Sequence, residues 1–171
     1  MNNFPHERMS KEEERRELET KSVYATKAMD LFRNGYNCAQ SVFGAFASSL
    51  GLDFETAVKI ASSFGGGIAR MREVCGAVSG MCMVAGYAFG YSNPDDFSEK
   101  AEHYKRIQQL LDSFRELNGS IICRELLGIT KPGADNPEPE KRTAMYYQKR
   151  PCELLVGQAA MILEKKLHLS S

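Results

Sequence analysis

Four of the five cysteines in this chain stand where a helix is predicted to begin. These four are Cys38, Cys75, Cys123 and Cys152. The start of a helix carries unpaired backbone N–H groups and a partial positive charge, so it favours a thiolate over a thiol. If the four helix starts meet in space, the sequence predicts a pocket of thiolates. Such a pocket suits a metal ion, an iron–sulfur cluster or dithiol redox chemistry.

Cationic residues and glycines surround these cysteines in the sequence. The cations that would balance several thiolates are Arg70, Arg72, Arg124, Lys149 and Arg150. We expect a group of glycines to let the backbone approach the site and, together with Arg70, to form a second layer around the ligands. These glycines are Gly65, Gly66, Gly67, Gly76 and Gly80.

The fifth cysteine, Cys82, is predicted to pack in the core. It follows Cys75 by seven residues in one predicted helix, which separates the two by about 10 Å along the helix axis. Two ligands of one ion cannot lie so far apart. The chain also has no closely spaced C-x2-C pair, which argues against an ordinary zinc finger. Taken singly, each cysteine is better explained as a small buried hydrophobe than as a ligand, because free cysteine is among the most buried residue types.

The elements that must position these residues are all predicted to be helices. Apolar residues recur at helical spacing along almost every segment, and no strand-like alternation persists. The predicted helices cover about residues 10–33, 37–50, 53–64, 74–90, 96–117 and 120–128, and a last one begins at Pro151. We therefore predict an all-α, single-domain bundle of six or seven helices over residues 1–171, around a glycine-rich central helix.

Two segments are predicted to lie outside the helices. Residues 1–9 read as a flexible N-terminus, and residues 128–150 as a long, proline-rich surface loop. A third segment, Val74 to Pro94, carries no charge over nearly the length of a membrane span. It is rich in small residues and only moderately apolar, so we interpret it as a buried central helix without membrane insertion.

Composition narrows the classes of function. The 171 residues suit one domain, and the formal net charge is zero, so nothing indicates a nucleic-acid partner. The charged N-terminus lacks the apolar core of a secretory signal, so we expect a cytoplasmic protein with reduced thiols. The partner expected is a redox protein that the sequence cannot name, and a homodimer is compatible with the apolar faces of the helices.

The segments around the four cysteines resemble the C_GCAxxG_C_C family of redox-active proteins. They read GYNCAQSVF, FGGGIARMREVCGAVSG, CRELLG and RPCELLV, and the resemblance runs from about Val23 to Leu167. It implies that Cys38, Cys75, Cys123 and Cys152 are the four cysteines in the family's name. A similar module in a split-Soret type cytochrome is associated with an iron–sulfur centre, although this chain lacks the C-x-x-C-H of a haem site. Relatives carry more glycine near the second motif, where this chain has Ala69 and Arg72.

Three interpretations remain open from the sequence. The leading one is an iron–sulfur cluster held by the four cysteines for electron transfer. The second is a thiol–disulfide oxidoreductase without metal, in which two of the cysteines form a reversible bridge. The third is a zinc-stabilised helical binding module with no redox role.

Overall fold

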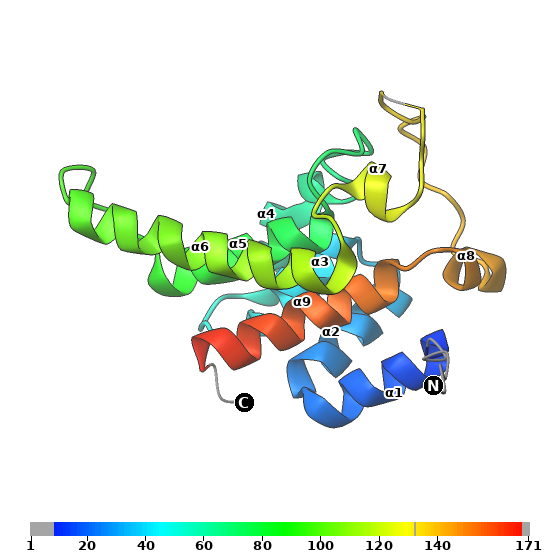
Figure 1. Cartoon of the computed structure of the whole chain (residues 1–171), viewed down its shortest axis with the longest axis horizontal. Coiled ribbons are helices and arrows are strands. Elements are labelled where there is room, and N and C mark those ends of the chain that lie inside the picture. The colour runs from blue at the N-terminus through cyan, green and yellow to red at the C-terminus, as the bar shows by residue number, and fades with distance from the viewer. Residues whose placement is uncertain (1–8, 132, 169–171) are drawn as a thin grey trace, which may run out of the picture.

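The protein is built from helices joined by turns and by longer loops (Figure 1). The computed structural model describes residues 9–131 and 133–168, so the predicted flexible N-terminus lies outside the described residues except for Met9. The helices are α1 (Lys11–Lys21), α2 (Val23–Arg33), α3 (Cys38–Phe46), α4 (Phe54–Ala61), α5 (Gly76–Phe89), α6 (Phe97–Asn118), α7 (Cys123–Leu126), α8 (Ala144–Lys149) and α9 (Cys152–Leu167). Seven of these nine have at least seven residues, and the described residues form no strand. The predicted all-α bundle is confirmed.

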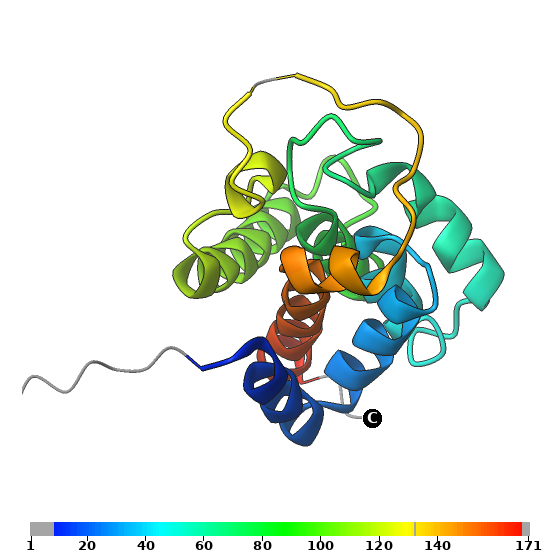
Figure 2. The same ribbon diagram turned by 90° about the vertical axis from the view of Figure 1, so that its right-hand side faces the viewer.

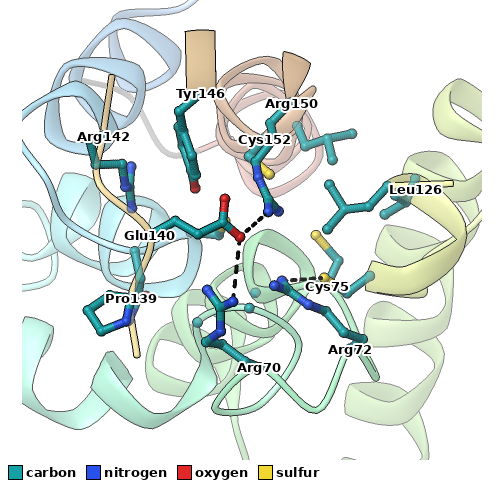
Figure 3. Close-up of a pocket in the computed structure, with 18 residues that line it drawn as sticks. Arg70, Arg72, Cys75, Leu126, Pro139, Glu140, Arg142, Tyr146, Arg150 and Cys152 are labelled. Atoms are coloured by element: carbon teal, nitrogen blue, oxygen red, sulfur yellow. Dashed lines mark hydrogen bonds and ion pairs between the residues drawn. The ribbon is translucent and has the colours of Figure 1, made fainter. Parts of the chain in front are cut away.

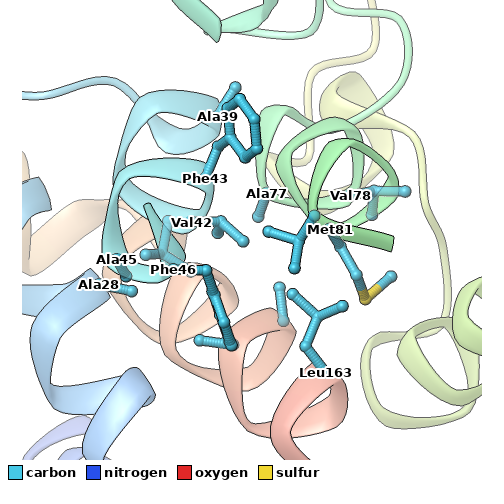
Figure 4. Close-up of a cluster of buried hydrophobic side chains, with 14 of the residues drawn as sticks. Ala28, Ala39, Val42, Phe43, Ala45, Phe46, Ala77, Val78, Met81 and Leu163 are labelled. Atoms are coloured by element: carbon cyan, nitrogen blue, oxygen red, sulfur yellow. The ribbon is translucent and has the colours of Figure 1, made fainter. Parts of the chain in front are cut away.

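Three helices form the centre of the bundle. Helix α9 contacts α1, α2, α3, α5 and α6, and α3 contacts α2, α4, α5 and α9 (Figure 2). The glycine-rich α5 lies against α3, α6 and α9. Side chains from all three central helices meet in one apolar cluster, in which Phe46, Met81 and Leu163 are fully buried (Figure 4). Burying such side chains is the main favourable contribution to the stability of the bundle.

Helices α3 and α5 approach each other backbone to backbone. A Cβ atom placed on Gly80 would lie 2.8 Å from the carbonyl oxygen of Ala39 and 2.9 Å from the Cβ of Val42. Only glycine fits at this crossing. The small residues predicted for the central helix therefore set how closely the N-terminal ends of α3 and α5 can lie.

The predicted helix over residues 10–33 is two helices. A capping box of Ser10 and Glu13 begins the first of them, but the chain leaves the helical conformation at Ser22, where φ is −152° and ψ is 120°. The Ser22 side chain accepts a hydrogen bond from the N–H of Ala25 and so caps α2. Serine is favoured at such a cap because its hydroxyl satisfies a backbone donor that the helix leaves free. The break lets Leu18 of α1 pack with Leu154 of α9.

Other predicted helices are shorter than expected. The predicted helix over residues 37–50 ends at Phe46, and the one over residues 53–64 ends at Ala61 and continues as a 3₁₀ turn. The one over residues 120–128 shrinks to Cys123–Leu126. Ser120, the first residue of that predicted range, lies outside the helix and accepts a hydrogen bond from the N–H of Ile122.

The segment predicted as a loop over residues 128–150 contains helix α8. Thr143 caps this helix by accepting a hydrogen bond from the N–H of Tyr146. We call residues 133–143 the strap, because they run from the α7 side of the molecule to α8. The strap is tied down by long-range contacts. Asp135 donates its backbone N–H to the carbonyl of Arg70, and Arg142 donates to the carbonyls of Phe32 and Tyr36.

None of the helices in the described residues combines the length and the apolar character needed to cross a lipid bilayer. The uncharged stretch that begins at Val74 forms α5, and the face of α5 that includes Ala77, Met81 and Val84 is fully buried against the rest of the bundle.

Candidate redox site

The four cysteines singled out in the sequence line one cavity of about 200 Å³ (Figure 3). Cys38, Cys123 and Cys152 are the first residues of α3, α7 and α9, and Cys75 directly precedes α5. Cys75, Cys123 and Cys152 are buried, and Cys38 is half-buried. Four helix starts that are remote in the sequence therefore converge.

A left-handed turn after α4 brings the second cysteine to the third. Residues 66–70 all have positive φ angles, which wind the chain opposite to an α-helix. The chain then pairs as a short bridge between Val74 and Ile122. Cys75 donates its N–H to the carbonyl of Ile121 over 2.8 Å, and Cys123 donates its N–H to that of Glu73 over 2.6 Å. These bonds hold the two cysteines next to each other.

At two of the predicted glycines, any side chain would collide with a cysteine of the cavity. A Cβ atom on Gly67, where φ is +70°, would lie 2.7 Å from the Cβ of Cys123. A Cβ on Gly76 would lie 3.0 Å from the Cβ of Cys38. Gly65 and Gly66 also line the cavity, whereas Gly80 does not line it and packs against α3 instead.

Two of the cysteines form a hydrogen-bonded pair. The thiol of Cys38 donates to the sulfur of Cys152, which raises the pKa of Cys38 and lowers that of Cys152. Burial opposes the lowering at Cys152, but Arg150, Arg142 and Arg72 add to it through their positive charge. Within this pair, Cys152 is the cysteine that carries a thiolate more readily.

The other two cysteines favour the thiol. Burial raises the pKa of Cys75 to about 12, against the opposing effect of the backbone N–H groups of Ala77 and Val78. Burial also raises the pKa of Cys123, although the guanidinium of Arg72 counteracts it. Binding of a metal or cluster would have to displace these two protons.

Four arginines line the same cavity, namely Arg70, Arg72, Arg142 and Arg150. The side chain of Arg72 is only 5% exposed; its Nη1 lies 3.8 Å from the Cys123 sulfur and its Nε lies 2.7 Å from an Asp135 carboxylate oxygen. The other cations expected from the sequence lie elsewhere. Arg124 pairs with Glu73, and neither Arg124 nor Lys149 lines the cavity.

Comparison with known proteins agrees with this arrangement. A family model described as "Putative redox-active protein (C_GCAxxG_C_C)" matches residues 36–166. The chain belongs to this family. The C_GCAxxG_C_C match contains all four cavity cysteines and leaves α1 and α2 outside it. No curated protein and no solved structure matches the chain.

Several residues that line this cavity of the C_GCAxxG_C_C protein were not expected from the sequence. Glu140, Arg142 and Tyr146 come from the strap and α8, and all three line the cavity. Burial raises the pKa of Tyr146 to about 12. The only local signal for them was the density of charges in the segment predicted to be a loop.

The remaining cysteine lies apart from the C_GCAxxG_C_C site. Cys82 is half-buried against the apolar cluster of the bundle and does not line the cavity. Burial raises its pKa to about 11. In residues 9–131 and 133–168, no three Cys, His, Asp or Glu side chains are grouped closely enough to hold a single metal ion.

Proposed function

We propose that this C_GCAxxG_C_C protein transfers electrons through an iron–sulfur cluster held by Cys38, Cys75, Cys123 and Cys152. The observation that carries the proposal is that four cysteines from four remote helix starts line one cavity together with four arginines. A cluster with four thiolate ligands is net negative, and the arginines would balance that charge.

When bound, the cluster would take up and release one electron at a time. The chain would supply the surroundings that set its potential. Arg72 donates toward the Cys123 sulfur, and a donor of this kind stabilises the more negative, reduced state. The contacts at Gly67 and Gly76 bring backbone within reach of the ligands, and burial of the cysteines limits access of water.

Anaerobic purification followed by iron and sulfide analysis and a visible spectrum tests this proposal. We expect a brown protein with iron and sulfide in equal amounts, either as purified or after reconstitution with ferrous iron and sulfide. Replacing any one of the four cysteines with alanine should lower the iron content severalfold. Cys82→Ala is the matched control and should retain the full content. A colourless protein that takes up no iron on reconstitution would contradict the proposal.

A specific observation favours a second candidate function, a thiol–disulfide oxidoreductase. Cys38 and Cys152 line the same cavity, and their interaction lowers the pKa of Cys152, which favours the thiolate that such an enzyme needs. The Cys152 thiolate would attack a substrate disulfide and form a mixed disulfide while one substrate thiolate leaves. Cys38, after losing its proton, would then attack the sulfur of Cys152 and release the second substrate thiolate. The substrate gains the two electrons that the cysteine pair loses.

Thiol counting separates the two candidates. Metal-free protein treated with oxidised glutathione should lose two of its five thiols if the pair cycles, and peptide mapping should find a Cys38–Cys152 bridge. Loss of no thiols, or a bridge between other cysteines, would contradict this candidate. No observation favours the zinc-stabilised module, and the same metal analysis would detect stoichiometric zinc.

A further inference from the structure

A carboxylate of the chain's own strap occupies the mouth of the cysteine cavity. The Glu140 side chain reaches between Arg70 and Arg150 and forms an ion pair with each (Figure 3). The Oε1 atom of Glu140 lies 3.5 Å from Nη2 of Arg70. Although burial alone would raise the pKa of Glu140, these two cations lower it, so Glu140 is an anion at neutral pH. The mouth of the cavity is therefore built to hold a carboxylate.

Glu140 holds this position weakly. Its side chain is 45% exposed, and ion pairs at such exposure contribute little because water and salt screen them. It also lies on the strap, outside any helix. Within the described part of the chain, the buried Nε–H of Arg70 has no hydrogen-bond partner, so Glu140 does not satisfy every donor at this place. An external carboxylate could make the same contacts.

We propose that Arg70 and Arg150 form a binding site for the carboxylate group of a small organic anion, which displaces Glu140 and is held beside the four cysteines. Arginine suits this role because its planar guanidinium matches the geometry of a carboxylate. The cavity volume of about 200 Å³ limits the ligand to a few non-hydrogen atoms beyond that group. The inference rests on the proposed function only in that the anion would lie next to the redox group. Binding of the anion itself does not require a cluster.

Two alkylating reagents of nearly equal size test the site in reduced, metal-free protein. Iodoacetate carries a carboxylate, whereas iodoacetamide is neutral, and both react with the same cysteine thiolate. The ratio of their rate constants at each cavity cysteine, measured by mass spectrometry at low salt, therefore reports anion binding and cancels changes in the thiolate fraction. Glu140→Gln should raise the ratio by about fivefold, because it removes the carboxylate that the two arginines share and leaves Arg70 only its longer ion pair with Asp135, and Arg70→Gln should lower it by a similar factor.

Two matched control variants and a change in salt concentration complete the test. Glu138→Gln, on the same strap but outside the cavity, and Arg106→Gln, on α6, should leave the ratio unchanged. Sodium chloride at high concentration should lower the ratio in the wild type and in Glu140→Gln. Equal ratios in the wild type, Glu140→Gln and Arg70→Gln would overturn the proposal. A lack of labelling by either reagent in Glu140→Gln would also overturn it, because the cavity would then not admit an anion of this size.

These outcomes are distinct from failure of the proposed function. If the ratios change as expected but reconstitution yields no iron, the anion site stands and the cluster fails. If the cluster forms in wild type and in Arg70→Gln but the ratios are equal, the cluster stands and the anion site fails. Circular dichroism of each variant checks that the helices remain folded.

Discussion

The guanidinium of Arg72 donates a hydrogen bond to the sulfur of Cys123 over 3.8 Å, from a backbone with a φ of +62°. A residue with a Cβ atom is strained in this left-handed conformation. The strained segment also includes Ile68, Ala69 and Arg70. Strain of this kind persists where the surroundings over-determine it, often at functional sites. We infer that the Arg72 side chain, which contacts both Cys123 and Asp135, is the reason that the strain is retained.

Two substitutions at position 72 should separate the strain from the side-chain contacts. Arg72→Gly and Arg72→Ala both remove the guanidinium, but only glycine relieves the left-handed backbone. Arg72→Gly should therefore be more stable to urea than Arg72→Ala by about 1 kcal/mol. At a position with a negative φ angle in a helix or strand, the alanine variant is usually the more stable of the two. If the alanine variant is as stable as the glycine variant, position 72 carries no strain.

Gly67→Ala should disturb the site more than an ordinary substitution in a turn. Its new Cβ would lie 2.7 Å from the Cβ of Cys123, in a backbone with a φ of +70°. We expect a loss in the free energy of unfolding of about 2–4 kcal/mol, from strain and from overpacking together. Gly119→Ala is the matched control, because φ is +80° there but the space beside it is open. It should lose only about 1–2 kcal/mol. Equal losses in urea unfolding would show that the contact with Cys123 does not matter.

Local signals in the sequence predicted most of the helix starts correctly. Ser10, Asn37 and Asp53 each accept a hydrogen bond from the N–H three residues later, as their types suggest. Such caps depend on neighbours within one turn of helix. The same chemistry at Ser22 was missed, because serine is also tolerated within a helix and the break depends on how α1 packs against α9.

The cysteine cavity was also only partly predictable from the sequence, because part of its lining depends on contacts between remote segments. The helix-start positions of the four cysteines follow from local signals, but whether the four starts meet in space depends on how the helices pack, so the sequence analysis could state it only as a condition. The position of Glu140 and Arg142 depends on contacts across more than 60 residues of sequence, such as those of Arg70 with Glu140 and of Arg142 with Phe32. No local pattern encodes such contacts. The strap therefore appeared in the sequence only as a charged loop.

The reactivity of Cys152 should titrate near neutral pH in reduced, metal-free protein. Its pKa is lowered to about 7, first by the hydrogen bond from Cys38 and then by the nearby arginines. Since the thiolate is the reactive form, the rate of alkylation by iodoacetamide should rise with pH and level off above this value. Cys38→Ala removes the donor, so the midpoint should shift upward. A pH profile of labelling by mass spectrometry measures both.

Cys82, in the same protein, serves as the control for the pH profile of Cys152 alkylation. Burial alone raises its pKa to about 11, so it should react little at pH 7 in either protein. An unchanged midpoint at Cys152 in Cys38→Ala would mean that the arginines, and not Cys38, stabilise the thiolate. Labelling of Cys152 only above pH 9 would contradict the lowered pKa itself.

Arg142 should anchor the strap over the cavity. It donates to the carbonyls of Phe32 and Tyr36 over 3.0 and 3.1 Å, and its guanidinium lies 4.3 Å from the centre of the Phe32 ring. These contacts join the strap to the end of α2. Arg142→Ala should therefore release the strap, and limited proteolysis within residues 133–143 should become about tenfold faster. The loss in global stability should be smaller, about 1–2 kcal/mol, because the helices of the bundle keep their packing.

The neighbouring residue provides the control for this prediction. Lys141 is exposed on the same strap, so Lys141→Ala removes a charge at almost the same place without removing the anchor. Its proteolysis rate should match that of the wild type once cleavage at lysine itself is avoided, for example by using an endopeptidase that cuts before aspartate, since Asp135 lies in the strap. If Arg142→Ala is cut no faster than Lys141→Ala, the strap is held mainly by the ion pairs of Asp135 and Glu140 with Arg72, Arg70 and Arg150. In that case a high salt concentration, which screens those pairs, should speed cleavage in the wild type instead.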